Sequence, residues 1–276
     1  MKVVVIVLAL AAAVSAGIQH IKVVDPFVEN LKWEPNPRIV NGQEAIPHSL
    51  PYMVYILFMA SGSAWMCGGA LLSENYVLTA AHCANGAETT YVTLGAHNTS
   101  AREDTQIRLT VPAANLKLHE EYVSSDIAND IAVIKLPSPV SFTEAIQTVR
   151  LPSKADVVDD FVGAVATASG WGLTDGTSTT ASQVLNYVNM DVISTAECRL
   201  YLGPTVPDKS VCTSGLDQTS VCLGDSGSPL VTEGVVIGVS AFVAKGCLLG
   251  YPSGWTRVTD YLDWIAANTD VKIACL

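Results

Sequence analysis

The sequence predicts an all-β protein that ends in one α-helix. Short apolar runs recur along the chain, and clusters of Gly, Asn, Ser, Asp and Pro separate them. The runs span residues 52–59, 69–72, 91–94, 131–136, 162–168, 183–192 and 235–243. Many short β-prone runs with regular turn signals are typical of a barrel or a sandwich. The last stretch differs, because Val258, Leu262 and Ile265 recur at helical spacing. This spacing predicts a helix that packs on the β core.

Composition and charge exclude several classes of protein. The chain has 276 residues, of which 49% are hydrophobic and 15% charged, so it can bury a large core and intrinsic disorder is excluded. The 26 acidic residues outnumber the 15 basic ones, which gives a net charge of −11. A nucleic-acid-binding protein would show a basic surface, and so would a protein that adheres to an anionic membrane. We therefore expect neither nucleic acid nor a membrane as a partner.

The first residues have the form of a secretory signal peptide. Lys2 is followed by twelve apolar residues, Val3 to Val14, and then by the small residues Ser15 and Ala16. Twelve helical residues span about 18 Å, whereas a bilayer core is about 30 Å thick. We expect residues 1–16 to be removed after Ala16, and the protein to be soluble and secreted into the extracellular space.

The seven cysteines are disulfide candidates in an oxidising compartment. They are Cys67, Cys83, Cys198, Cys212, Cys222, Cys247 and Cys275. The sequence contains no C-x-x-C pair and no H-E-x-x-H motif, so it supports neither a zinc site nor another metal or cofactor. Six cysteines can pair in fifteen ways, and spacing alone does not choose among them.

Three short strings carry the side chains needed for nucleophilic catalysis. In chain order they are Thr79-Ala80-Ala81-His82-Cys83, Asn129-Asp130-Ile131-Ala132-Val133 and Gly224-Asp225-Ser226-Gly227-Ser228-Pro229. A serine hydroxyl is a weak nucleophile, so an imidazole must take its proton during attack. A carboxylate must fix the tautomer of that imidazole. Ser226 lies among glycines, where a sharp turn can aim amide N–H groups at a developing oxyanion.

Each string has an ordinary structural explanation when it is taken alone: a packed histidine, a turn before a strand, and a loop. A competing enzyme class is the α/β-hydrolases, whose nucleophile lies in a G-x-S-x-G turn. Ser228 occupies the final glycine position of that pattern. The chain also lacks the alternation of strands and helices that this fold requires.

Together with Ile39-Val40-Asn41-Gly42 and Ser169-Gly170-Trp171-Gly172, these strings resemble the chymotrypsin-like (trypsin-fold) serine endopeptidases. The resemblance runs from about Ile39 to Ile265. It implies two six-stranded antiparallel Greek-key barrels packed together, roughly residues 39–150 and 151–276, with the C-terminal α-helix. It implies that His82 is the general base and acid, Asp130 orients it, and Ser226 is the nucleophile. The N–H groups of Gly224 and Ser226 would form the oxyanion hole.

The resemblance also implies a zymogen that is cross-linked by three disulfides. Residues 17–38 would be an activation propeptide that a trypsin-like protease removes at the Arg38–Ile39 bond. The freed α-amino group of Ile39 would then pair with Asp225. The implied disulfides are Cys67–Cys83, Cys198–Cys212 and Cys222–Cys247. Cys275 would be left over as a free or capped thiol.

Specificity is expected to depend on three residues of the primary pocket. By resemblance, Ser220 lies at the pocket base, Val243 narrows one wall, and Ser253 replaces another pocket glycine. A serine at the base offers no carboxylate to a Lys or Arg side chain. The pattern is closest to elastases and to the brachyurin group of arthropod chymotrypsins. We expect broad cleavage after uncharged, apolar residues, whereas the choice between aliphatic and aromatic residues stays open.

Three departures from the family pattern bear on activity. Ala241 replaces a serine that usually helps to hold the catalytic aspartate, although a shift of one residue would bring Ser240 into that role. Ser228 and Asn41 each replace a glycine. The alternative function is a catalytically silent secreted homologue that acts by binding proteins, but such homologues usually lose a triad residue.

The remaining expectations concern partners and modification. Protein and peptide substrates, an activating trypsin-like protease and protein inhibitors are the expected partners of a monomer. A simple propeptide without an accessory domain suits digestion. The sequon Asn98-Thr99-Ser100 makes Asn98 a candidate for glycosylation.

Overall fold

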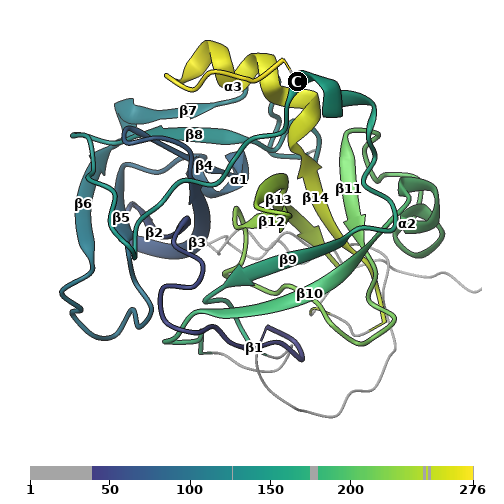
Figure 1. Cartoon of the computed structure of the whole chain (residues 1–276), viewed down its shortest axis with the longest axis horizontal. Coiled ribbons are helices and arrows are strands. Elements are labelled where there is room, and N and C mark those ends of the chain that lie inside the picture. Colours follow the sequence, from purple (N-terminus) through teal and green to yellow (C-terminus); the bar gives the residue numbers. More distant parts are fainter. Residues whose placement is uncertain (1–38, 126, 175–179, 245–246, 248–249, 276) are drawn as a thin grey trace, which may run out of the picture.

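The computed structural model describes residues 39–125, 127–174, 180–244, 247 and 250–275. The expected signal peptide, the expected propeptide and Arg38 lie outside the described residues. The described chain forms two antiparallel seven-stranded sheets, which Figure 1 shows beside each other. The expected fold class is thereby confirmed.

The first sheet has the strand order β6-β5-β2-β3-β4-β8-β7. Its strands are β2 (Met53–Ala60), β3 (Ser63–Leu71), β4 (Tyr76–Thr79), β5 (Thr89–Leu94), β6 (Ile107–Pro112), β7 (Leu116–Leu118) and β8 (Ala132–Lys135). From Val54 to Phe58 of β2 the side chains alternate between buried and half-buried, with Val54, Ile56 and Phe58 buried. This alternation puts one face of the strand into the core.

The second sheet has the order β1-β10-β11-β14-β13-β12-β9, and a further β9–β10 pairing closes all its strands except β1 into a ring. The strands are β1 (Gln43–Glu44), β9 (Val165–Gly170), β10 (Asn186–Ile193), β11 (Ser210–Thr213), β12 (Pro229–Thr232), β13 (Val235–Val243) and β14 (Ser253–Arg257). Each sheet therefore has one strand more than the six expected. The extra strand here is β1, which pairs with β10 at the outside of the ring.

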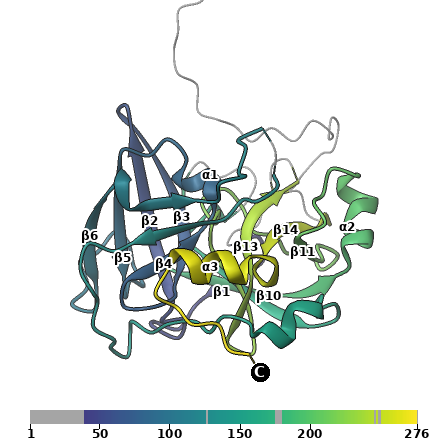
Figure 2. The same cartoon turned by 90° about the horizontal axis from the view of Figure 1, so that it is seen from above.

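Three α-helices and three 3-10 turns complete the described chain. They are α1 (Ala81–Ala84), α2 (Thr195–Leu202), α3 (Leu262–Asn268), η1 (Ala113–Asn115), η2 (Lys154–Val158) and η3 (Val258–Tyr261). The predicted C-terminal helix is present as η3 and α3. Leu262 and Ile265 are buried in the core of the first sheet, and both views show α3 lying over that sheet, far from α2 (Figures 1 and 2). No helix of the described residues is long and apolar enough to cross a membrane.

Candidate active site

The three motif strings meet where the two sheets face each other. His82 lies on α1, directly after β4, and Asp130 lies two residues before β8, so both come from the first sheet. Ser226 lies in the turn before β12 of the second sheet. The next residue, Gly227, packs so closely on the end of β4 that a side chain there would collide with Thr79 Oγ1. This contact brings the Ser226 turn against the segment that carries His82.

A short hydrogen bond joins His82 to Asp130. His82 Nδ1 lies 2.6 Å from Asp130 Oδ2, and the His82 backbone N–H donates to Asp130 Oδ1 over 2.8 Å. Asp130 is 3% exposed. Burial lowers the pKa of His82, but the charge of Asp130 and its hydrogen bond outweigh that effect, so the pKa is raised. The two bonds hold the ring with Nδ1 toward the carboxylate, which leaves Nε2 available as a base.

Ser226 sits in a turn whose backbone is tied on several sides. Its carbonyl accepts from Gly68 N–H over 2.8 Å, and the Gly227 N–H donates to the Ser240 carbonyl over 2.9 Å. Gly224 has φ +97°, a conformation that favours glycine. Among the described residues, neither the Gly224 amide nor the Ser226 amide donates a hydrogen bond. Both are therefore free to donate to an oxyanion.

No hydrogen bond joins Ser226 Oγ to the His82 ring in the described part of the chain. In unliganded active sites the hydrogen bond between the nucleophile and the base is often long or poorly aligned, and it tightens when substrate binds. One further side chain, which the sequence did not indicate, borders the turn: Met66 Cε lies against the α-carbon of Gly224. The sequence feature that could have indicated Met66 is its position directly before Cys67.

The three predicted pocket residues lie together. Val243 pairs with Ser253 across β13 and β14, and Ser253 Oγ is 3.3 Å from Ser220 Oγ. Both serines are buried, and Ser220 Oγ also donates to the Val221 carbonyl over 2.8 Å. This cluster has hydroxyl groups and no ionised side chain. The Cys222–Cys247 disulfide and Val243 belong to one apolar cluster beside it.

The first residues after the expected cleavage point are buried beside this cluster. Ile39 is 0% exposed and Val40 pairs with Ser220 in an isolated β-bridge. Asp225 is buried too and accepts from Gly172 N–H at 2.8 Å and Cys222 N–H at 3.0 Å. Burial raises the pKa of Asp225 to about 6, and the two backbone bonds oppose this rise only in part.

The structure has the disulfides Cys67–Cys83, Cys198–Cys212 and Cys222–Cys247, the same pairs that the resemblance implies, and Cys275 is free and exposed. Cys67, His82 and Cys83 bring possible metal ligands within 4.8 Å of one another. The two sulfurs are bonded to each other, so no thiolate is available and this group does not fit a metal.

Ser240 does not take over the role of the serine that Ala241 replaces near Asp130. A bulge in the β13–β14 pairing lies between Ser240 and Phe242, so that Ala241 is skipped by the register. Ser240 pairs with Trp255. Among the described residues, the Asp130 carboxylate accepts hydrogen bonds from His82 and not from Ser240.

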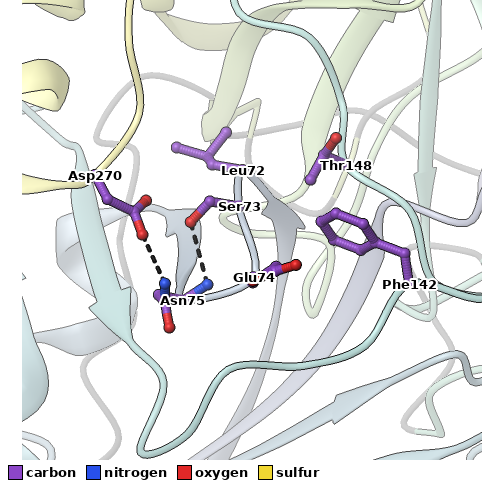
Figure 3. Close-up of a pocket in the computed structure, with 7 residues that line it drawn as sticks. All are labelled: Leu72, Ser73, Glu74, Asn75, Phe142, Thr148 and Asp270. Atoms are coloured by element: carbon purple, nitrogen blue, oxygen red, sulfur yellow. Dashed lines mark hydrogen bonds between the residues drawn. The ribbon is translucent and has the colours of Figure 1, made fainter.

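One hollow of the described surface lies away from this site. It has a volume of about 430 Å³ and is lined by Leu72, Ser73, Glu74, Asn75, Phe142, Thr148 and Asp270 (Figure 3). An Asn75–Asp270 hydrogen bond of 2.7 Å crosses one side of it. None of the residues in the three motif strings lines this hollow, so it takes no part in their chemistry.

Comparisons with known proteins agree with this geometry. The family model described as Trypsin matches residues 39–265. The chain is 40% identical to a chymotrypsin of Phaedon cochleariae, over 98% of this chain and 99% of the relative. It is 42% identical to a brachyurin of Leptuca pugilator, over 84% and 99% respectively. A solved collagenase structure superposes with a TM-score of 0.77 at 34% identity, covering 85% of this chain and 100% of the other.

The matched region contains both sheets and all three motif strings. The chain belongs to the trypsin family of serine proteases and is a chymotrypsin-like serine endopeptidase.

Proposed function

We propose that the chain is a secreted digestive zymogen whose cleaved form hydrolyses peptide bonds after uncharged apolar residues. The observation that carries the chemistry is the 2.6 Å His82–Asp130 hydrogen bond, which engages Nδ1 and leaves Nε2 as the nitrogen that can act as a base. His82, Asp130 and Ser226 are the proposed catalytic residues. The relatives named chymotrypsin, brachyurin and collagenase support this proposal.

In the proposed reaction His82 takes the proton of Ser226 Oγ while that oxygen attacks the scissile carbonyl. The carbonyl oxygen becomes negative, and the free amides of Gly224 and Ser226 donate to it. His82 then gives its proton to the leaving amine, which departs and leaves an acyl-enzyme. Water, activated by His82, hydrolyses the ester. Asp130 stabilises the imidazolium in both halves of the reaction.

Cleavage at Arg38–Ile39 is the proposed activation step. The buried carboxyl of Asp225 has backbone donors but no cation among the described residues, and burial raises its pKa to about 6. A free amine at Ile39 would supply that cation. Buried charges need a partner, so the amine would favour the turn geometry in which Gly224 and Ser226 can act.

The specificity proposal depends on Ser220, Ser253 and Val243. Their cluster presents hydroxyl and aliphatic groups, which leaves a cationic substrate side chain without a carboxylate. The Val243 side chain takes up room that a glycine would leave open. Apolar pockets discriminate by about 1–3 kcal/mol per methylene, so the preference should be broad.

Active-site labelling tests the enzyme against the silent homologue. The cleaved protein is treated with an organophosphorus probe, and the labelled peptide is identified by mass spectrometry. We expect one label on Ser226 and none on the Ser226→Ala variant. Folded, cleaved protein that takes no label would instead be a binding protein without catalytic activity. An uncleaved Arg38→Gln variant should label far more slowly if activation needs the cut.

A peptide library then tests specificity and role. Cleavage sites are read by mass spectrometry from a mixture of peptides that differ at the residue before the scissile bond. Cleavage after Ala, Val, Leu, Met or Phe fits the proposal, and dominant cleavage after Lys or Arg contradicts it. Inhibition by protein inhibitors of chymotrypsin-like enzymes, and elution as a monomer in gel filtration, are expected of the same material.

Asn98 is the proposed glycosylation site. Its Oδ1 accepts from the Ser100 N–H and hydroxyl at 2.9 and 2.7 Å, whereas its Nδ2 makes no hydrogen bond to another described residue. The nitrogen that would carry the glycan is thus unengaged. A mass unchanged by N-glycosidase treatment of the secreted protein would contradict this proposal.

A further inference from the structure

The backbone around Asp130 is held by side chains other than His82. Thr256 Oγ1 donates to the Asp130 carbonyl over 2.8 Å, and Thr256 is buried. Tyr261 Oη donates to Asn129 Oδ1 over 3.0 Å, across a sequence separation of 132. Both donors come from the C-terminal part of the chain, from β14 and η3.

We propose that Thr256, Tyr261 and Asn129 are positioning residues that fix Asp130 for its bond with His82. The inference rests on the proposed role of Asp130 and adds residues that act through it. None of the three touches the His82 ring or Ser226. They act on the peptide unit from which the Asp130 side chain projects.

Asn129 has a backbone conformation that needs support. Its φ is +54°, which is uncommon for a residue other than glycine. The carbonyl of Asn129 accepts from Ile131 N–H at 2.9 Å, so the chain turns tightly around Asp130. The Asn129 side chain is held at both ends, since Nδ2 donates to the Glu121 carbonyl at 3.3 Å and Oδ1 accepts from Tyr261. A loss of either contact would free the turn to relax.

A cavity of about 220 Å³ lies beside this turn. Asn129, Thr256 and Tyr261 line that cavity, together with Lys209 and Glu121. The hydrogen bonds from Thr256 and Tyr261 add directed restraints on this side of the turn. These hydrogen bonds matter more because Ala241 stands where a serine usually helps to hold the aspartate. Among the described residues, the Asp130 carboxylate is hydrogen-bonded only to His82.

Two substitutions remove the bonds while keeping the shapes of the side chains. Thr256→Val removes the donor to Asp130, and Thr256→Ser restores a hydroxyl. Tyr261→Phe removes the donor to Asn129 and keeps the ring that packs on His119 and lies under Lys209. The charged neighbours of Tyr261, which include Lys209, Asp260 and Glu121, are unchanged.

The readout is the pH profile of kcat and kcat/KM on a chromogenic peptide, normalised to active sites titrated with the organophosphorus probe. We expect kcat to fall about tenfold in Thr256→Val and about threefold to tenfold in Tyr261→Phe, with KM unchanged. The acidic limb should move to lower pH, because a displaced Asp130 raises the pKa of His82 less. Thr256→Ser should recover most of the loss.

A double-mutant cycle tests the link through Asn129. Asn129→Gly accepts the positive φ without a side chain, so Tyr261→Phe should have no further effect in that background. Thr232→Val is the matched control, because Thr232 Oγ1 also donates to a backbone carbonyl, that of Val165 at 3.0 Å. It should leave kcat and the pH profile unchanged.

The inference is overturned if the wild-type enzyme labels and turns over normally and both Thr256→Val and Tyr261→Phe have the same kcat and the same acidic limb as the wild type. A fall in activity that follows only a loss of titratable sites would overturn it as well, since that is a folding defect. A wild-type protein without labelling would instead refute the proposed function.

Discussion

At the scale of single residues, Asp130 has the largest expected effect on catalysis after Ser226 and His82. Asp130→Asn keeps the shape of the side chain but puts an NH2 or a neutral oxygen opposite His82 Nδ1, which favours the wrong tautomer. We expect kcat to fall by about 10⁴, the magnitude typical of this change in serine proteases. Steady-state kinetics measure it, with Asp263→Asn as control, because the Asp263 carboxylate is exposed and pairs with Lys154. A loss below tenfold would contradict the orienting role.

A second prediction at this scale concerns Val243. Val243→Gly removes the side chain opposite Ser253 and widens the proposed pocket. We expect kcat/KM for substrates with Phe or Tyr before the scissile bond to rise about tenfold relative to substrates with Ala. Val235→Gly is the matched control, because Val235 lies at the other end of β13. It should lower stability without changing the ratio. An unchanged ratio in Val243→Gly would place the pocket wall elsewhere.

The proposed reacting residues could be read from the sequence because each lies in a short local motif, such as Gly224-Asp225-Ser226-Gly227. The sequence could not predict the residues that hold them. Tyr261 and Asn129 are 132 positions apart, and only the packing of η3 on the first sheet brings them together. The bulge at Ala241 was equally hidden, because a register shift depends on the partner strand as well as on the sequence of β13.

At the scale of elements, α2 shows where periodicity fails. The helix begins after Ser194, whose hydroxyl accepts from Glu197 N–H, and ends at Gly203 with φ +84°. These capping signals were present in the sequence, but the helix buries only Cys198 and has no apolar stripe. The strands β1, β4, β6, β7, β11, β12 and β14 were missed for another reason. They have two to six residues each, too few for alternation to stand out, and the sheet around them fixes their conformation.

Because α2 buries so little, we expect its attachment to depend on the Cys198–Cys212 disulfide. The bridge joins the helix to β11 and closes a loop of 14 positions. Removing it in Cys198→Ala/Cys212→Ala should lower the free energy of unfolding by about 3 kcal/mol. Urea unfolding and the melting temperature measure the loss. Cys275→Ser is the control and should change neither, because Cys275 is exposed and unpaired. An unchanged midpoint in the double variant would show that packing of α2 suffices.

At the scale of the whole molecule, elements near each end of the described chain pack against the sheet that the other half of the chain forms. β1 opens the described chain but pairs with β10 of the second sheet, whereas Leu262 and Ile265 of α3 pack into the core of the first. The proposed catalytic side chains are divided in the same way, since His82 follows β4 and Asp130 precedes β8 of the first sheet, whereas Ser226 precedes β12 of the second. We therefore expect cleavage before Ile39 to affect the stability of the whole fold.

The pH dependence of stability should therefore differ between the uncleaved and the cleaved protein. In the uncleaved chain burial raises the pKa of Asp225 from 3.8 to about 6. A carboxyl with a raised pKa binds its proton more tightly in the folded state, so this group makes folding less favourable as pH rises from about 4 to about 6. The shift is worth about 3 kcal/mol above that range. Cleavage supplies the Ile39 amine as a partner and should remove the penalty until the amine loses its proton.

The measurement is urea unfolding of both forms from pH 4 to pH 7, with Ser226→Ala in each to prevent self-digestion. The cleaved form should gain stability over the uncleaved form as pH rises through this range, because only the uncleaved form keeps an unpaired buried carboxylate. Asp225→Asn is the control, since an amide does not titrate and should make the difference independent of pH. Parallel stability curves for the two forms that carry Asp225 would mean that the amine of Ile39 does not reach this carboxyl, and the activation mechanism would then need a different partner for it.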